Sequence, residues 1–140
     1  MERFHMSVES TSFELSDEEI KFLNAIFDVV RAGHLAKLTS LLDQGIPVDF
    51  TDTKGDSLLI LAAYHEHTQL VELLLSRGAN IDALNDRGQT PLVCAVFRNN
   101  EEITKILLDA GADARLGHQT PAEVADFFNL PHMKELLAGK

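Results

Sequence analysis

The feature that most constrains this chain is a set of residues that recur every 33 positions. These are the glycines Gly45, Gly78 and Gly111, with the leucine pairs Leu41–Leu42, Leu74–Leu75 and Leu107–Leu108 ahead of them. Gly55 and Gly88, Leu59 and Leu92, and Ala62 and Ala95 hold the same spacing. A fixed period of this size indicates a stack of similar supersecondary units rather than a single globular core.

Each period predicts two short helices and a turn. In the central unit, LLILAAYH (58–65) predicts a first helix, and TQLVELLLSRG (68–78) predicts a second helix with one broad apolar face. Gly78 follows the last apolar residue, where a left-handed glycine can close a helix. One unit later, Thr90 can cap the next first helix and Pro91 suits its first position.

Tight turns and modified end units complete the expected stack. Gly55 and Gly88 lie in the polar segments TDTKGDS and NDRGQT, which predict turns that project from the stack. Ser16 and Glu19 have capping-box spacing at the start of a longer helix over 17–32, which predicts an N-terminal cap. TPAEVA at 120–125 follows TPLVCA after 30 residues instead of 33, and we expect a C-terminal cap there.

With this period and the motifs GQTPL (88–92) and LLLSRGANIDA (73–83), the chain resembles the ankyrin repeat family from about residue 18 to 137. The resemblance implies an all-α solenoid of about four helix–turn–helix units with capping units at both ends. We expect the units at about 16–50, 51–83, 84–116 and 117–140. Residues 1–15 form a tail that we expect to be flexible; alternatively, the tail docks on the concave face or on a partner.

The resemblance also implies that a partner protein binds on a concave face built from turn tips and the exposed sides of the first helices. The matching positions are Thr53, Lys54, Asp56, Ile60, Tyr64, His65, Asp86, Arg87, Gln89, Val93, Phe97, Arg98, Glu123 and Phe127, with Phe128 beside the last. Ile60 and Val93 replace the histidine of the family's TPLH motif, so we expect a more apolar first-helix surface. Aromatic and arginine residues dominate binding hot spots, although Tyr64, Phe97 and above all Phe127 could instead fill the core.

No residues suggest catalysis, a cofactor or a metal. His65 and His67 lie two apart, so on a helix they would point to different faces and not share a metal. The resemblance implies that His34 and His67, at one repeat position, form hydrogen bonds between units. Cys94 is expected to be a small buried residue, and no phosphate-binding glycine motif is present. We therefore predict that the chain is not an enzyme.

Charge and cysteine content narrow the expected partners. A net charge of -10 argues against binding to nucleic acid or anionic membranes and favours a basic protein partner.

The single cysteine rules out an internal disulfide, and no signal-like or membrane-spanning apolar run is present, so we expect a cytoplasmic protein. The leading hypothesis is an adaptor or inhibitor of one protein. The alternatives are an immunity protein that neutralises a toxic or hydrolytic enzyme, and self-association as a weak homodimer.

Overall fold

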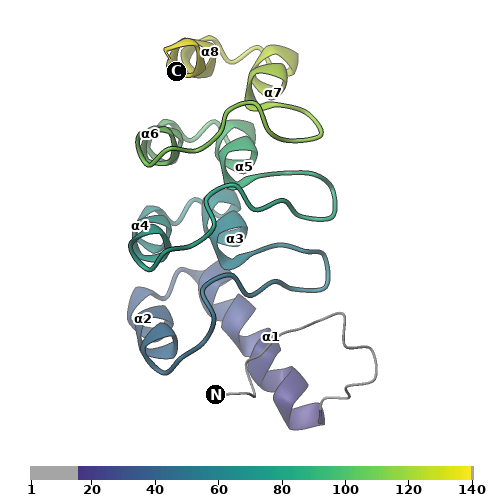
Figure 1. Ribbon diagram of the computed structural model, residues 1–140, viewed down its shortest axis with the longest axis vertical. Coiled ribbons are helices and arrows are strands. Elements are labelled where there is room, and N and C mark those ends of the chain that lie inside the picture. Colours follow the sequence, from purple (N-terminus) through teal and green to yellow (C-terminus); the bar gives the residue numbers. More distant parts are fainter. Residues whose placement is uncertain (1–15, 140) are drawn as a thin grey trace.

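The computed structural model describes residues 16–139, and within this range eight helices form four successive pairs (Figure 1). The pairs are α1 (Asp17–Ala32) with α2 (Leu35–Asp43), α3 (Leu58–Tyr64) with α4 (Thr68–Ser76), α5 (Pro91–Phe97) with α6 (Glu101–Asp109), and α7 (Pro121–Phe127) with α8 (Pro131–Ala138). First helices contact first helices of neighbouring pairs, and second helices contact second helices. The predicted all-α solenoid is confirmed, whereas the predicted tail at 1–15 lies outside the described residues.

Side-chain caps explain where several helices begin. The Ser16 Oγ accepts a hydrogen bond from the Glu19 backbone N–H at 3.1 Å, and the Glu19 carboxylate accepts one from the Ser16 N–H at 2.9 Å. This predicted capping box starts α1. The Thr90 Oγ1 likewise accepts from the Val93 N–H at 3.1 Å, and Pro91 occupies the first turn of α5 as predicted.

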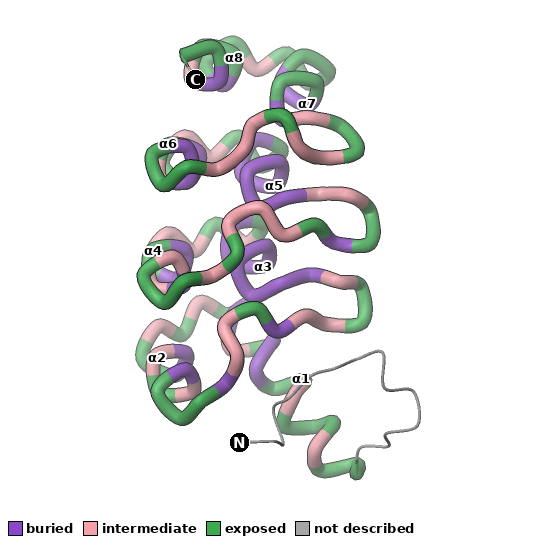
Figure 2. The backbone as a smooth tube through the Cα atoms, viewed as in Figure 1, coloured by how far each residue is buried: buried purple, intermediate pink, exposed green. Residues whose placement is uncertain are grey.

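The first helices form the centre of the core. Residues 58–63 of α3 and 91–96 of α5 are all buried, because neighbouring first helices and their own second helices enclose them (Figure 2). The second helices bury one face only, as an amphipathic surface helix does. Leu74 of α4 and Leu107 of α6 are 0% exposed, which confirms that the repeated leucines are structural.

The expectation that Ile60 and Val93 make the first-helix surface more apolar is wrong. Their side chains are 2% and 3% exposed. Both are the third residue of a helix, held by a bond from their N–H to the capping hydroxyl, and both side chains are enclosed by the stack. Val93 packs close to Gly117 of the next unit, where an added Cβ would lie 3.1 Å from Val93 Cγ2. An apolar residue suits this closed site.

The loops ahead of α3 and α5 project sideways and lie on one another (Figure 1). We call residues 51–57 finger 1 and residues 84–90 finger 2. The Asp86 N–H of finger 2 donates to the Lys54 carbonyl of finger 1 at 3.1 Å. Gly55 has a φ of +78°, and a Cβ there would come within 2.5 Å of the Asp86 carboxylate. Glycine is therefore required both by the turn and by the close approach of the fingers.

Candidate functional site on the concave face

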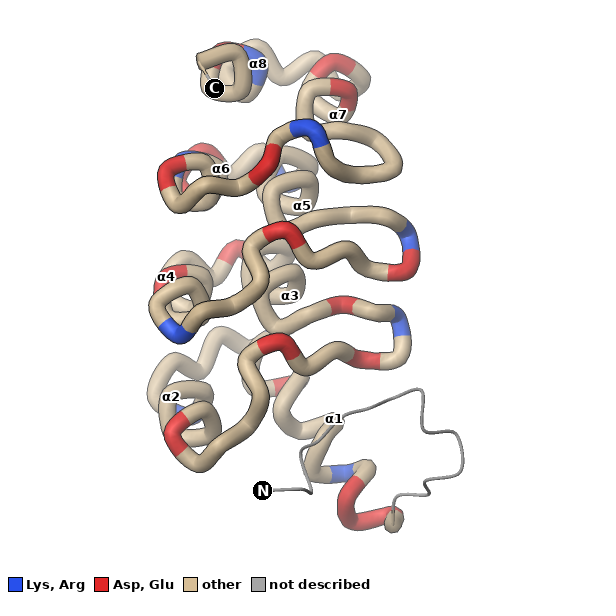
Figure 3. The backbone as a smooth tube through the Cα atoms, in the orientation of Figure 1, with Lys and Arg blue, Asp and Glu red and all other residues tan. Residues whose placement is uncertain are grey.

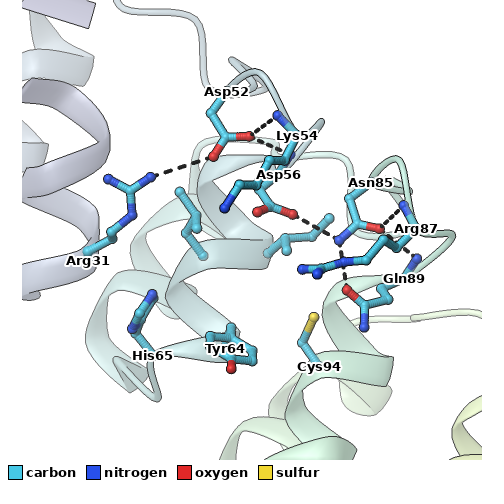
Figure 4. A pocket seen from close by; sticks show the side chains of 12 residues that line it. Arg31, Asp52, Lys54, Asp56, Tyr64, His65, Asn85, Arg87, Gln89 and Cys94 are labelled. Carbon is cyan, nitrogen blue, oxygen red and sulfur yellow. Dashed lines mark hydrogen bonds and ion pairs between the residues drawn. The ribbon is translucent and has the colours of Figure 1, made fainter. Parts of the chain in front are cut away.

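The two fingers and the first helices enclose a hollow of about 230 Å³ on the concave face (Figure 4). Seven of the residues predicted for this face line it: Lys54, Asp56, Ile60, Tyr64, His65, Arg87 and Gln89. Side chains from both fingers and from the first helices α1, α3 and α5 thus meet at one place. The repeat period brings them together, since equivalent residues of neighbouring units stack side by side.

Other predicted residues lie elsewhere. Thr53 and Asp86 line an adjoining hollow of about 720 Å³ between finger 1 and α1, which shares Arg31, Asp52 and Lys54 with the first hollow. Glu123 is a capping residue, because its carboxylate accepts from the Thr120 N–H at 2.8 Å and its own N–H donates to the Thr120 hydroxyl. The buried Val93 offers a partner almost no surface. The structure therefore does not bring all the predicted residues into one site.

Five lining residues were missed by the sequence analysis: Arg31, Asp52, Leu61, Asn85 and Cys94. Arg31 lies 33 residues before the predicted Tyr64, so the repeat period could have found it. Asp52 and Asn85 directly precede the predicted turn residues Thr53 and Asp86, and extending each predicted turn by one residue would have included them. Cys94 was expected to be buried, and it lies in the floor of the hollow with 2% of its surface exposed. Burial raises the pKa of its thiol to about 12, so it remains a neutral wall residue rather than a nucleophile.

The side chains of Asp52 and Asn85 stabilise the turn conformation of finger 1 and finger 2. The Asp52 carboxylate accepts from the N–H groups of Lys54 and Asp56 at 2.9 and 3.0 Å. The Asn85 carbonyl oxygen accepts from the backbone two and four residues later, at 3.0 and 2.9 Å. The Asn85 side-chain amide donates to the Asp56 carboxylate at 2.8 Å. The same local turn is thus built twice, and one buried hydrogen bond joins the two copies.

Four aromatic side chains lie at the ends of α3, α5 and α7, and we call Tyr64, Phe97, Phe127 and Phe128 the aromatic strip. Tyr64 and Phe97 are stacked with centroids 6.3 Å apart, and Phe97 meets Phe128 edge to face at 5.4 Å. They are 39%, 44%, 75% and 48% exposed in sequence order. The alternative that Tyr64, Phe97 and Phe127 fill the core is therefore wrong.

Arg98 is fixed beside this strip. Its guanidinium donates to the Glu66 carboxylate at 2.9 Å, and its Cζ lies 5.2 Å from the centre of the Tyr64 ring. The hydrogen bond from Arg98 is the main reason why the pKa of Glu66 lies below its ordinary value. A planar guanidinium suits both contacts at once. The contact ties α3 to the unit that follows.

His65 stands between the hollow and the strip, with its ring 5.2 Å from Tyr64 in an edge contact. Burial lowers the pKa of His65 below 6.5, and the positive charges of Arg31 and Arg98 and the neighbouring His67 lower it further. His67 has a different role. Its Nε2–H donates to the Arg31 carbonyl at 2.7 Å, which confirms the expected hydrogen bond between units for His67. The His34 side chain makes no such bond among residues 16–139.

The described part of the chain offers no clear metal site. Within residues 16–139, no group of three or more His, Cys, Asp or Glu side chains is arranged to hold a metal ion. None of the helices described here is both long and apolar enough to span a bilayer.

Comparison with known proteins agrees with the fold. A family model for ankyrin repeats (3 copies) matches residues 26–117. An ankyrin repeat protein of Pseudomonas aeruginosa is 45% identical over 60 residues, a match that covers 43% of this chain and 35% of that protein. The matched segment thus spans about a third of the relative's length. Ankyrin repeats generally serve as protein-interaction modules, and this chain belongs to the ankyrin repeat family.

Proposed function

We propose that this chain binds one partner protein through its concave face and acts as an adaptor or inhibitor of that protein. The observation that carries the proposal is the aromatic strip, a row of partly exposed rings that runs across three units beside the hollow. Tyr64 of the strip lines the hollow together with the charged finger residues Lys54, Asp56 and Arg87. An apolar centre with a polar rim is the usual arrangement of a protein interface.

The energetics of the strip favour a protein partner. Aromatic side chains contribute large buried areas at interfaces with few rotatable bonds, and Tyr and Arg are among the residue types enriched at hot spots. Tyr64 and Phe97 already support each other by stacking, and Arg98 is already held by Glu66. Little side-chain conformational freedom would therefore be lost on binding, which lowers the entropic cost of association.

An affinity pulldown from native lysate tests the proposal, with the wild-type chain beside a Tyr64→Asp/Phe97→Asp variant. Circular dichroism first establishes that both are folded. We expect one protein to be retained by the wild type and lost from the variant, because two carboxylates would be desolvated without partners. Retention of the same protein by both baits would place binding elsewhere and refute the proposal.

A matched control separates the concave face from the added charge. Gln69 in α4 and Ala36 in α2 are both exposed and lie outside the hollow and the aromatic strip. The Gln69→Asp/Ala36→Asp variant carries the same charge change and should retain the partner. The proposal also includes a cytoplasmic location, which the single cysteine supports.

A further inference from the structure

The charges around the hollow differ in sign from the charge of the whole chain. The chain has a net charge of -10. The hollow, however, is lined by three cations, Arg31, Lys54 and Arg87, and by only two carboxylates, Asp52 and Asp56. Figure 4 shows the Arg87 side chain extending over the floor of the hollow near Cys94 and Tyr64. Local charge, not net charge, determines which group can enter such a site.

Both carboxylates already have partners within the protein. Asp52 accepts two backbone N–H groups and lies 3.6 Å from the Arg31 guanidinium. Asp56 is 8% exposed and accepts from the Asn85 amide. These internal interactions already neutralise much of the negative charge that the two carboxylates could offer to a cation from a partner. A basic side chain entering the hollow would therefore find little unengaged negative charge.

Two of the cations are not compensated in this way. Lys54 and Arg87 are exposed at equivalent positions of the two fingers, 33 residues apart. Among residues 16–139, no ion pair involves either of them. Finger stacking fixes their spacing, because the Asp86 N–H beside Arg87 is bonded to the Lys54 carbonyl. Each finger thus carries one Lys or Arg near its tip (Figure 3), and neither of these two charges has an ion-pair partner among the described residues.

We infer that the partner inserts an acidic side chain, Asp or Glu, into this hollow and places an adjacent apolar residue on the aromatic strip. This inference rests on the proposed function and specifies the chemistry of the partner. The guanidinium of Arg87 can bind a carboxylate through two hydrogen bonds, and Lys54 adds a second charge. At about 230 Å³, the hollow is smaller than the roughly 300–1,000 Å³ of drug-sized ligand sites and suits one or two side chains.

The inferred segment differs from the basic partner that the net charge favours. Net charge and local charge act over different distances. The net charge influences the approach of a whole protein, whereas the charges around the hollow select the side chain that enters it. Nucleic acid is disfavoured because its many phosphates would face the acidic remainder of the chain. An acidic side chain on an otherwise neutral or basic partner is compatible both with the negative net charge of the chain and with the positive charges around the hollow.

Peptide selection tests the inference without knowledge of the partner. A phage-displayed library of random peptides is selected on the full chain, and the enriched peptides are synthesised for titration. We expect Asp or Glu next to an aromatic or aliphatic residue. The Lys54→Glu/Arg87→Glu variant should bind these peptides at least about tenfold more weakly. The affinity of the wild type for these peptides should decrease when the salt concentration is raised from about 50 to about 500 mM.

Lys21→Glu/Lys37→Glu is the matched control, because both lysines are exposed on α1 and α2 outside the hollow and the net charge changes equally. It should weaken binding by less than about threefold. Enriched peptides without acidic residues, or equal losses in both variants, would overturn the inference. If the inference is overturned in this way but the enriched peptides do not bind the Tyr64→Asp/Phe97→Asp variant, the proposed function still stands, because binding depends on the aromatic strip. If no peptide depends on Tyr64 and Phe97, the proposed function and the inference both fail.

Discussion

At the scale of single residues, Thr104 of α6 is a buried hydroxyl with no partner. It is 0% exposed, and its Oγ1 has no hydrogen-bond partner among the described residues. The same repeat position holds Val71 one unit earlier and Leu38 two units earlier, both fully buried. The stack therefore accepts an apolar side chain at this position, and the hydroxyl is desolvated without compensation.

Thr104→Val should therefore stabilise the chain by about 1 kcal/mol, because it keeps the branched shape and removes the unpaired hydroxyl. Urea unfolding would show this as a higher midpoint with an unchanged slope. Thr104→Ser is the control: it keeps the hydroxyl, loses the methyl group and should destabilise. A lower midpoint for the valine variant would mean that the hydroxyl has a partner in solution.

His65 gives a prediction about pH. Its pKa is lowered by burial first, and then by His67, Arg31 and Arg98, while Asp56 opposes the shift. The folded chain thus favours the neutral ring, whereas the unfolded chain binds a proton at the ordinary pKa of 6.5. This contribution to stability is complete above pH 6.5 and is lost as the pH falls through 6.5 towards the lowered value.

The measurement is an NMR titration of His65 together with urea unfolding at about pH 7.5 and about pH 5.5. We expect a titration midpoint below 6.5. The wild type should also lose more stability on acidification than His65→Gln. The remaining histidines are common to both proteins, so the difference between the two isolates His65. A midpoint at or above 6.5 would show that burial and the neighbouring positive charges do not lower the pKa of His65.

At the scale of elements, the link between first and second helix needs one left-handed residue in every unit. Gly33, Asn99 and Asn129 fill this position with φ of 77°, 54° and 54°, and Glu66 fills it with 63°. Glycine and asparagine accept this conformation readily, whereas a glutamate is strained by roughly 1–2 kcal/mol. Glu66 offsets the strain through its hydrogen bonds to Arg98 and Asn100 of the next unit.

Glu66→Asn separates strain from the ion pair. In high salt, where the exposed ion pair is screened, the variant should be more stable than the wild type by up to about 1 kcal/mol. In low salt the gain should shrink, because the wild type regains the Arg98 contact. Urea unfolding of both proteins at two salt concentrations measures the change, with Asn99→Asp as a control for charge at the equivalent position. A variant that is less stable in high salt would argue against backbone strain.

The elements were largely predictable from sequence because their ends depend on local chemistry. Ser16 with Glu19, and Thr90 with Pro91, specify helix starts through hydrogen bonds that involve only nearby residues. The candidate site was less predictable, because exposure depends on which units enclose a residue. Ile60 was expected on the surface, yet its helix lies between two other first helices.

At the scale of the whole molecule, stability should vary along the stack. Within residues 16–139, the main helix contacts lie inside a unit or between neighbouring units: α4 packs against α2, α3 and α6, whereas the terminal α8 packs against α6 and α7. In such an array, stability is approximately a sum of unit and interface contributions. A central defect therefore weakens two interfaces, while a defect in the last unit weakens one.

Leu74→Ala in α4 and Leu137→Ala in α8 test this dependence. Leu74 is 0% exposed, so its truncation should cost roughly 2–5 kcal/mol and lower the protection of helices on both sides. Leu137 is 8% exposed at the end of the stack, and its truncation should release α7 and α8 while α3 and α5 keep their protection. Amide hydrogen exchange resolved by helix distinguishes the two patterns. An equal loss of protection across all helices in both variants would mean that the described stack unfolds as one cooperative unit, with interfaces too strong for its end to open separately.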